Sequence, residues 1–290
     1  MQCTGFLFLV YLCCAGAYKI LVISPMPAKS HSILTDAIVK HLSSAGHEKL
    51  LSDKNEYFDV LIIEWMFTEV YAGLSNVYNC PYIWFSSVEP HWMILDLVDE
   101  SPNPSYNADI TSDSVPPFSF LQRVKELSFQ ALGRLLRYYY TSSVEKQLYE
   151  EYLIPHIKSR GGEIFSLDTL KYNASLLLSN SHVSLGMPVR HPANFIPIGG
   201  YHIDSNVKPL PQNLQSIMDN ATHGVIYFSM GSNLRSNHFP DEIKQSLLKI
   251  FGKLNQTVLW KFEEDLPNRP SNVHILQWAP QQSILGKMLM

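Results

Sequence analysis

Residues 225–262 read VIYFSMGSNLRSNHFPDEIKQSLLKIFGKLNQTVLWKF and contain the alternation that decides the fold. The apolar run Val225–Ser229 predicts a buried strand, and the loop Met230–His238 follows it. Asp241–Asn255 is predicted as a helix, and Thr257–Phe262 as the next strand. A strand, a helix and a second strand in this order normally form a parallel pair with a crossover. The stretch therefore indicates an α/β domain with a parallel sheet.

The pattern continues toward the end of the chain. Val273–Gln277 predicts one more strand, Trp278–Gln282 a turn, and Ser283–Met290 a short apolar helix with nothing after it to pack against. We expect residues 205–290 to be the first part of a doubly wound domain. A Gly pair and two prolines within Gly199–Pro211 indicate the linker that precedes it.

The first domain, residues 18–204, shows the same alternation. Four apolar runs predict strands at Lys19–Ile23, Phe58–Ile63, Tyr82–Phe85 and Ala174–Ser179. Helices are expected at His31–Ala45, Thr68–Asn76 and Phe118–Leu153. Pro155 is expected to stop or bend the last of these helices. The predicted fold class is therefore α/β, with two Rossmann-like doubly wound domains, the C-terminal one incomplete.

The N-terminus is typical of a secretory signal peptide over residues 1–17. An apolar run over Phe6–Cys14 precedes the small-residue cleavage pattern Ala15-Gly16-Ala17. The run is too short to span a bilayer, which takes about 20 apolar residues. Cleavage would leave Cys80 as the only cysteine and would place the product in the endoplasmic reticulum lumen or outside the cell. Three glycosylation sequons agree with this route, at Asn173, Asn220 and Asn255.

The composition excludes some function classes. The chain has 290 residues, of which 46% are hydrophobic and 17% charged, which fits a globular protein with a substantial core. Its net charge is −4, and no Lys/Arg block accompanies interleaved aromatic residues. A nucleic-acid partner is therefore not expected.

The stretch SPMPAKSHSIL, residues 24–34, places His31 on a loop that leads from a strand into a helix. Ligands of open α/β sheets bind at this end of the strands. An imidazole titrates near neutral pH in general, which suits a general base there. The alternative is a polar residue that helps Ser30 or Ser32 cap the helix.

The stretch FDVLIIEWMF, residues 58–67, places Glu64 at the carboxyl end of its strand. Glu64 could therefore face the same crevice as His31, where a carboxylate would orient the imidazole and stabilise the imidazolium. The alternative is that Glu64 begins a surface turn.

Two stretches of the second domain could contact a ligand. In VIYFSMGSN, residues 225–233, the candidate anion donors are the backbone around Gly231 and the side chains of Ser229, Ser232 and Asn233. The loop lacks the glycines of nicotinamide and ATP motifs, and an ordinary βα turn is the alternative. In LQWAPQQSIL, residues 276–285, Trp278 could stack on a flat heterocycle and Gln281 could bind its edge or a ribose hydroxyl. Core packing of Trp278 and helix capping by Gln281 are the alternatives.

Taken together, the motifs form a recognisable series. The order P-x-P-x-x-S-H, F-D-V-x-I-x-E, F-S-x-G-S, L-W-K-F and W-x-P-Q-x-x-I-L resembles the UDP-glycosyltransferases of animals, the insect branch most closely. The resemblance runs from about Tyr18 to Gly286. It is strongest in FSMGSN, VLWKFE and ILQWAPQQSILG.

This resemblance implies a GT-B fold, with an acceptor-binding domain followed by a UDP-sugar-binding domain. It implies that His31 deprotonates an acceptor hydroxyl, and that Glu64 supports this base where many relatives have Asp. It also implies that Ser232 contacts phosphate, while Trp278 and Gln281 lie on the uridine side. The co-substrate would be UDP-glucose or UDP-glucuronic acid, with no metal or other cofactor. The acceptor would be a small lipophilic hydroxyl compound such as a phenol, plant toxin or steroid.

The sequence also departs from the family pattern. The His/Gly-rich phosphate loop, the sugar-binding residues and the membrane helix of full-length relatives are not found, and the segment between Gly46 and Phe58 is shortened. The alternative expectation is therefore a catalytically impaired isoform. It would act as an acceptor-binding or regulatory fragment, as a homo-oligomer or paired with a full-length relative.

Overall fold

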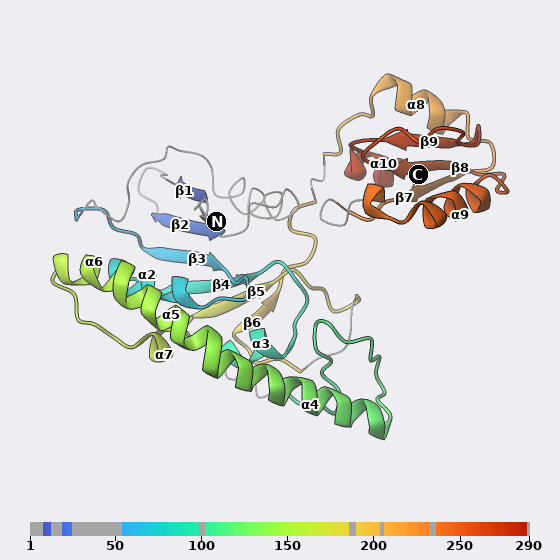
Figure 1. Ribbon diagram of the computed structural model, residues 1–290. Helices are drawn as coiled ribbons and strands as arrows, with labels where there is room; N and C mark the ends of the chain where they lie inside the picture. Colours follow the sequence, from blue (N-terminus) through green and yellow to red (C-terminus); the bar gives the residue numbers. More distant parts are fainter. Residues whose placement is uncertain are drawn as a thin grey trace. The chain divides into compact units, whose positions relative to one another are not determined.

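The computed structural model describes residues 8–12, 19–24, 54–98, 102–185, 190–203, 206–231 and 236–288. The described residues up to His202 form one compact unit, and those from Ile203 onward form another. Each unit combines a sheet of parallel strands with helices (Figure 1), so the predicted α/β class is confirmed.

The sheet of the first unit follows the order of the chain. Its strands are β1 (Phe8–Leu12), β2 (Ile20–Ser24), β3 (Val60–Glu64), β4 (Tyr82–Ser86), β5 (Leu176–Ser179) and β6 (Phe195–Pro197). β1 is antiparallel to β2, and β2 to β6 are parallel. The reversal of strand order that gives a doubly wound sheet its switch point is not among these described strands.

The consecutive order explains where the core lies. Right-handed crossovers between successive neighbouring strands place their helices on the same face of a sheet. Leu21, Ile63 and Trp84 accordingly pack with the helices in one large buried cluster. Because neighbouring strand residues point to opposite faces, Val22 and Ile62 lie in a separate, smaller cluster on the other face.

Short helices cover the large cluster. They are η1 (Val70–Ala72), α2 (Gly73–Tyr78), α3 (Trp92–Leu95), η2 (Asp96–Val98) and α7 (Leu167–Leu170). Every residue of α2 is buried. Gly73 permits this close packing, because a Cβ atom there would lie 2.6 Å from the ring of Tyr149.

One long run of helix completes the first unit (Figure 1). Its parts are α4 (Phe120–Leu136), η3 (Arg137–Thr141), α5 (Ser142–Leu148), η4 (Tyr149–Leu153) and α6 (Ile154–Ser159), η3 and η4 being π-helical. Ser119 and Gln122 form a capping box at its start. Of the two expectations for Pro155, that it stops the helix is wrong, because α6 contains this residue and continues to Ser159. The proline lies in the first turn of α6, a position that tolerates its missing N–H.

The second unit has a smaller sheet in the order β7-β8-β9. Its elements are α8 (Gln212–Asp219), β7 (Val225–Phe228), η5 (Ser236–His238), α9 (Asp241–Phe251), β8 (Thr257–Lys261), β9 (Val273–Leu276) and α10 (Gln281–Met288). The central strand β8 is buried over four of its five residues, whereas β7 has no buried residue. α10 does find a packing partner: Ile284 is fully buried in a cluster with Leu214 and Met218 of α8, a helix that the sequence did not predict.

Candidate functional site

Polar side chains end four neighbouring strands of the larger sheet. Ser24, Glu64, Ser86 and Ser179 are the last residues of β2, β3, β4 and β5, and each is at most 3% exposed. The carboxyl ends of parallel strands meet at one edge of a sheet, which is where α/β proteins bind ligands. These residues therefore form a buried polar edge, in which Glu64 lies at the carboxyl end of its strand, as predicted.

Glu64 is held within this edge. Its side chain is 1% exposed, and the Ser24 hydroxyl donates a hydrogen bond to Oε2. The alternative in which Glu64 begins a surface turn is therefore wrong. Burial of a carboxylate is costly unless donors satisfy it, so the Ser24 contact determines where the carboxylate points.

Tyr201 is a neighbour of Glu64 that the sequence did not indicate. Its ring packs edge-on against Phe85, with 6.0 Å between centroids. Burial raises the pKa of the Tyr201 phenol, and the negative charge of Glu64 raises it further. Tyr201 therefore carries its proton at neutral pH. His31, the residue expected to share this site, lies outside the described residues.

A second buried polar cluster follows β3. Glu69 is 3% exposed, accepts a hydrogen bond from Trp65 Nε1 at 2.8 Å and pairs with Arg137. Its backbone N–H donates to Glu145 Oε1 at 2.7 Å. Burial and the charge of Glu69 both raise the pKa of Glu145. The partners come from segments about 70 residues apart, so no local sequence pattern indicates the cluster.

His91 lies against this cluster. Its ring is 5.2 Å from that of Trp65, and neither ring nitrogen has a hydrogen-bond partner among the described residues. Burial lowers the pKa of His91 to about 4, against a smaller opposing effect of Asp109. The imidazole is therefore neutral at physiological pH.

The corresponding edge of the smaller sheet is only partly buried: Lys261 at the end of β8 is buried, whereas Ser229 is half-buried. Ser229 directly follows β7, and its hydroxyl accepts the Gly231 N–H at 3.2 Å. Gly231 has a φ of +82°, a conformation that favours glycine. Ser232 and Asn233 lie outside the described residues, so the full anion loop stays a prediction.

Trp278 and Gln281 follow β9 at the same edge. Trp278 is 51% exposed, so the alternative that it packs in the core is wrong. The Tyr227 hydroxyl donates to Gln281 Oε1 at 3.3 Å, which connects the start of α10 to β7. The Trp278 ring is thus accessible to a ligand.

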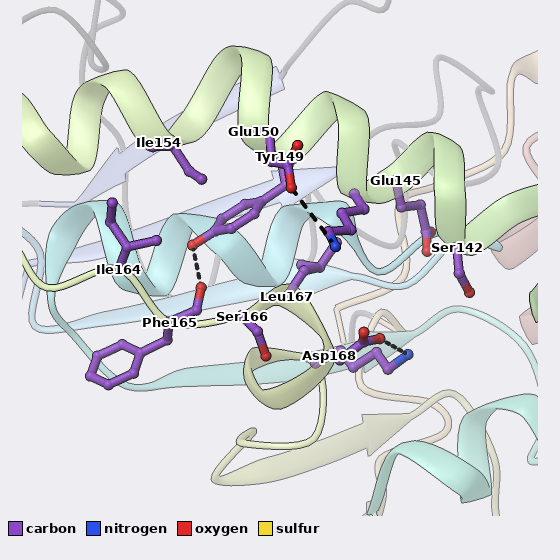
Figure 2. Close-up of a pocket in the computed structure, with 12 residues that line it drawn as sticks. Ser142, Glu145, Tyr149, Glu150, Ile154, Ile164, Phe165, Ser166, Leu167 and Asp168 are labelled. Atoms are coloured by element: carbon purple, nitrogen blue, oxygen red, sulfur yellow. Dashed lines mark hydrogen bonds and ion pairs between the residues drawn. The ribbon is translucent and has the colours of Figure 1, made fainter.

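A cavity of about 300 Å³ lies elsewhere in the first unit, between the helices α5, α6 and residues 164–171. Tyr149 lines it, and its hydroxyl donates to the Phe165 carbonyl at 2.9 Å (Figure 2). Lys171 and Asp168, which pair at 3.0 Å, also line it. Sequence reasoning did not indicate this cavity.

Among the described residues, no group of three or more His, Cys, Asp or Glu side chains could hold a metal ion. No helix in the part of the chain that the structure describes has the length and apolar character needed to cross a membrane.

Comparison with known proteins gives a consistent result. The sequence model of the UDP-glucoronosyl and UDP-glucosyl transferase family matches residues 34–288. UDP-glucosyltransferase 2 of Dactylopius coccus is 31% identical over 238 residues, which cover 82% of this chain and 45% of the relative. UDP-glucuronosyltransferase 1A4 of Oryctolagus cuniculus is 27% identical over 255 residues, which cover 86% of this chain and 43% of the relative. The chain spans about half the length of the curated relatives it matches.

A solved structure shows weaker likeness. The glycotransferase of kitacinnamycin is 14% identical with a TM-score of 0.44, over 89% of this chain and 56% of that protein.

Proposed function

Because the chain belongs to the UDP-glucoronosyl and UDP-glucosyl transferase family, we propose that it transfers a hexose from a UDP-sugar to a hydroxyl group of a small lipophilic acceptor. The observation that carries this proposal is the buried carboxylate of Glu64 at the carboxyl end of β3, with Ser24 donating to it. The sugar is glucose or glucuronic acid, since the similar proteins include transferases named for each.

The proposed chemistry uses His31 and Glu64. His31 follows the end of β2 by seven residues, and β2 pairs with β3. The imidazole takes the acceptor proton while the new bond forms between the acceptor oxygen and the anomeric carbon. The bond to the UDP oxygen breaks on the opposite face, UDP leaves with the electron pair, and the configuration inverts. Glu64 orients the imidazole and stabilises its protonated form.

The proposed donor contacts lie on the second unit. Ser229, Gly231, Ser232 and Asn233 would donate to the diphosphate, where charge develops as UDP leaves. Trp278 would stack on the uracil ring, and Gln281 would bind on the uridine side. The exposure of Trp278 supports this assignment.

A second candidate function is an acceptor-binding or regulatory fragment that pairs with a full-length relative. The observation that favours it is the absence of any buried residue in β7, whereas β2 and β3 of the larger sheet are each buried over four of their five residues. Because β7 is not buried, the residues that follow it, which are the proposed UDP-sugar contacts, are held in place by few packing contacts.

The proposed route is secretory. The predicted signal peptide would deliver the chain to the endoplasmic reticulum lumen or the exterior, where lipophilic toxins could be acceptors. Asn173, Asn220 and Asn255 of the three sequons are all exposed, as glycosylation requires.

The test is a thermal melt of the chain with and without UDP-glucose or UDP-glucuronic acid, followed by a transfer assay. A ligand at about 100 times its Kd stabilises the folded state by roughly 2.7 kcal/mol, which raises the Tm. If the unmutated chain transfers, His31→Ala and Glu64→Gln should each lower kcat/KM by about 10²–10⁴-fold. If either variant transfers at the unmutated rate, the substituted residue has no part in the mechanism. If neither UDP-sugar changes the Tm, the second candidate function, an acceptor-binding or regulatory fragment, is favoured.

A further inference from the structure

The buried side of α4 is polar. Glu126 and Gln130 are its buried residues, at 0% and 2% exposure. Glu126 accepts the Asp109 N–H at 2.8 Å and the Ser112 hydroxyl, and Gln130 Nε2 donates to the Asn107 carbonyl at 3.0 Å. The loop before α4 is thus attached to the helix by hydrogen bonds.

A close contact at Gly133 also fixes which side of α4 faces the protein. A Cβ atom at Gly133 would lie 2.9 Å from the Trp92 ring, so the indole packs directly on the helix backbone. Trp92 Nε1 in turn donates to Asp109 at 2.6 Å. Because Glu126, Gln130 and Gly133 lie on one side of α4, the helix cannot rotate without breaking these contacts.

The opposite side of α4 and η3 is apolar and exposed. At 100° per residue, the arc of α4 centred opposite Glu126 contains no charged residue, and the exposed Tyr138 and Tyr139 of the π-helical η3 follow it. Its large side chains are between 45% and 77% exposed: Phe120, Leu121, Val124, Leu127, Leu132, Leu135, Tyr138 and Tyr139. We name this set the apolar stripe. Soluble proteins rarely expose contiguous apolar patches of this extent unless they bind a partner.

The charges beside the apolar stripe are basic. Arg123 and Arg134 lie along one side and Lys125 along the other, whereas Glu126, the only acid between Ser119 and Thr141, faces inward. Lys125 pairs with Asp113 at 2.5 Å and Arg134 with Asp96 at 3.4 Å. Both pairs are exposed, so they contribute little and can exchange for lipid phosphates.

We propose that the apolar stripe lies on the surface of a phospholipid bilayer that contains anionic headgroups. A helix with an apolar face, basic flanks and aromatic residues at one end is typical of an interfacial helix, with Tyr138 and Tyr139 at headgroup level. A second copy of the chain fits less well, because a symmetric contact would bring the basic flanks together, and α4 itself carries no exposed acid to pair with those of the other copy. The proposal does not rest on the transferase function.

The test is sedimentation of the full chain with vesicles of phosphatidylcholine alone or mixed with an equal part of phosphatidylserine. We expect binding to the mixed vesicles that weakens with salt. The double variant Leu132→Glu/Leu135→Glu should bind at least about tenfold more weakly, because two apolar anchors are lost and negative charge is added. Unchanged circular dichroism would show that the variant folds.

The matched control is Ile243→Glu/Ile250→Glu on α9, where the two isoleucines are 48% and 56% exposed. This control should bind vesicles within about twofold of the unmutated chain, since α9 is outside the proposed surface. The proposal is overturned if the unmutated chain does not bind vesicles, or if the control loses binding equally. It is also overturned if Leu132→Glu/Leu135→Glu only dissolves a dimer seen by analytical ultracentrifugation.

Discussion

The carboxyl edge of the larger sheet is buried and hydrogen-bonded, whereas that of the smaller sheet is buried only at β8, where Lys261 is 7% exposed, and is more open beside β7 and β9. Glu64 is 1% exposed and accepts from Ser24, while Trp278 is 51% exposed. The difference follows from the strands behind each edge, since β3 is largely buried and β7 has no buried residue. The Glu64 carboxylate is therefore enclosed and hydrogen-bonded by the protein itself, whereas the Trp278 ring is accessible to a ligand.

The largest expected difference between the two units is in how strongly a buried histidine makes the free energy of unfolding depend on pH. The pKa of His91 is about 4 in the folded chain and near 6.5 when unfolded, so its neutral form contributes stability above pH 6.5 that is lost as pH falls toward 4. The loss corresponds to about 3 kcal/mol. His91→Leu should remove this part of the pH dependence, measured by urea unfolding at several pH values.

His274 of the second unit is the control. Its side chain is half-buried, and burial and Arg269 lower its pKa. His274→Leu should change the pH dependence less than His91→Leu, because a half-exposed imidazole keeps part of its hydration. Equal changes would contradict the distinction between the two units.

A Gly→Ala substitution in each unit, which adds one methyl group, tests how tightly the two units are packed. Gly73→Ala would place Cβ 2.6 Å from the Tyr149 ring and should lower the free energy of unfolding by about 1–3 kcal/mol. Gly286→Ala in α10 would meet only Val207 at 3.4 Å, so it should be neutral or stabilise by up to about 1 kcal/mol. Similar losses from both variants, measured by urea unfolding, would show that the second unit is packed as tightly as the first.

The smallest expected effect compares two serines at the carboxyl ends of strands, Ser24 in β2 and Ser229 directly after β7. Ser24→Ala removes a donor from a buried carboxylate and should lower the free energy of unfolding by about 1–2 kcal/mol. Ser229→Ala should change it by less than about 0.5 kcal/mol, since Ser229 is only half-buried. Thermal melts of both variants test this, and a neutral Ser24→Ala would mean that other groups hold Glu64.

Most strands could be predicted from the sequence, because short apolar runs such as VLIIE and VLWK have few alternatives to a buried strand. β6 was not predicted, since its three residues include a proline. α8 was not predicted because the prolines before it indicated only a linker. The local patterns therefore indicate an element when it is long or strongly apolar, and not otherwise.

Less of the candidate sites than of the fold could be predicted from the sequence. The position of Glu64 follows from the rule that strands of a parallel sheet end at one edge, but its burial and its electrostatic effect on the pKa of Tyr201 depend on residues far away in the chain. The long helix could also be predicted, but not its orientation. An apolar stripe normally faces the core, and here Glu126, Gln130 and Gly133 make the contacts that turn it outward.

β1 has a consequence for how the chain is produced. Its five residues pair with β2 along the edge of the larger sheet, and they lie within the segment predicted to direct secretion. Cleavage of the predicted signal peptide would remove β1 from the sheet. A chain produced in a cytoplasm, where this cleavage does not take place, keeps the six-stranded sheet. A chain cleaved after Ala17 instead begins its sheet at β2, whose free edge can then pair with a strand of another molecule.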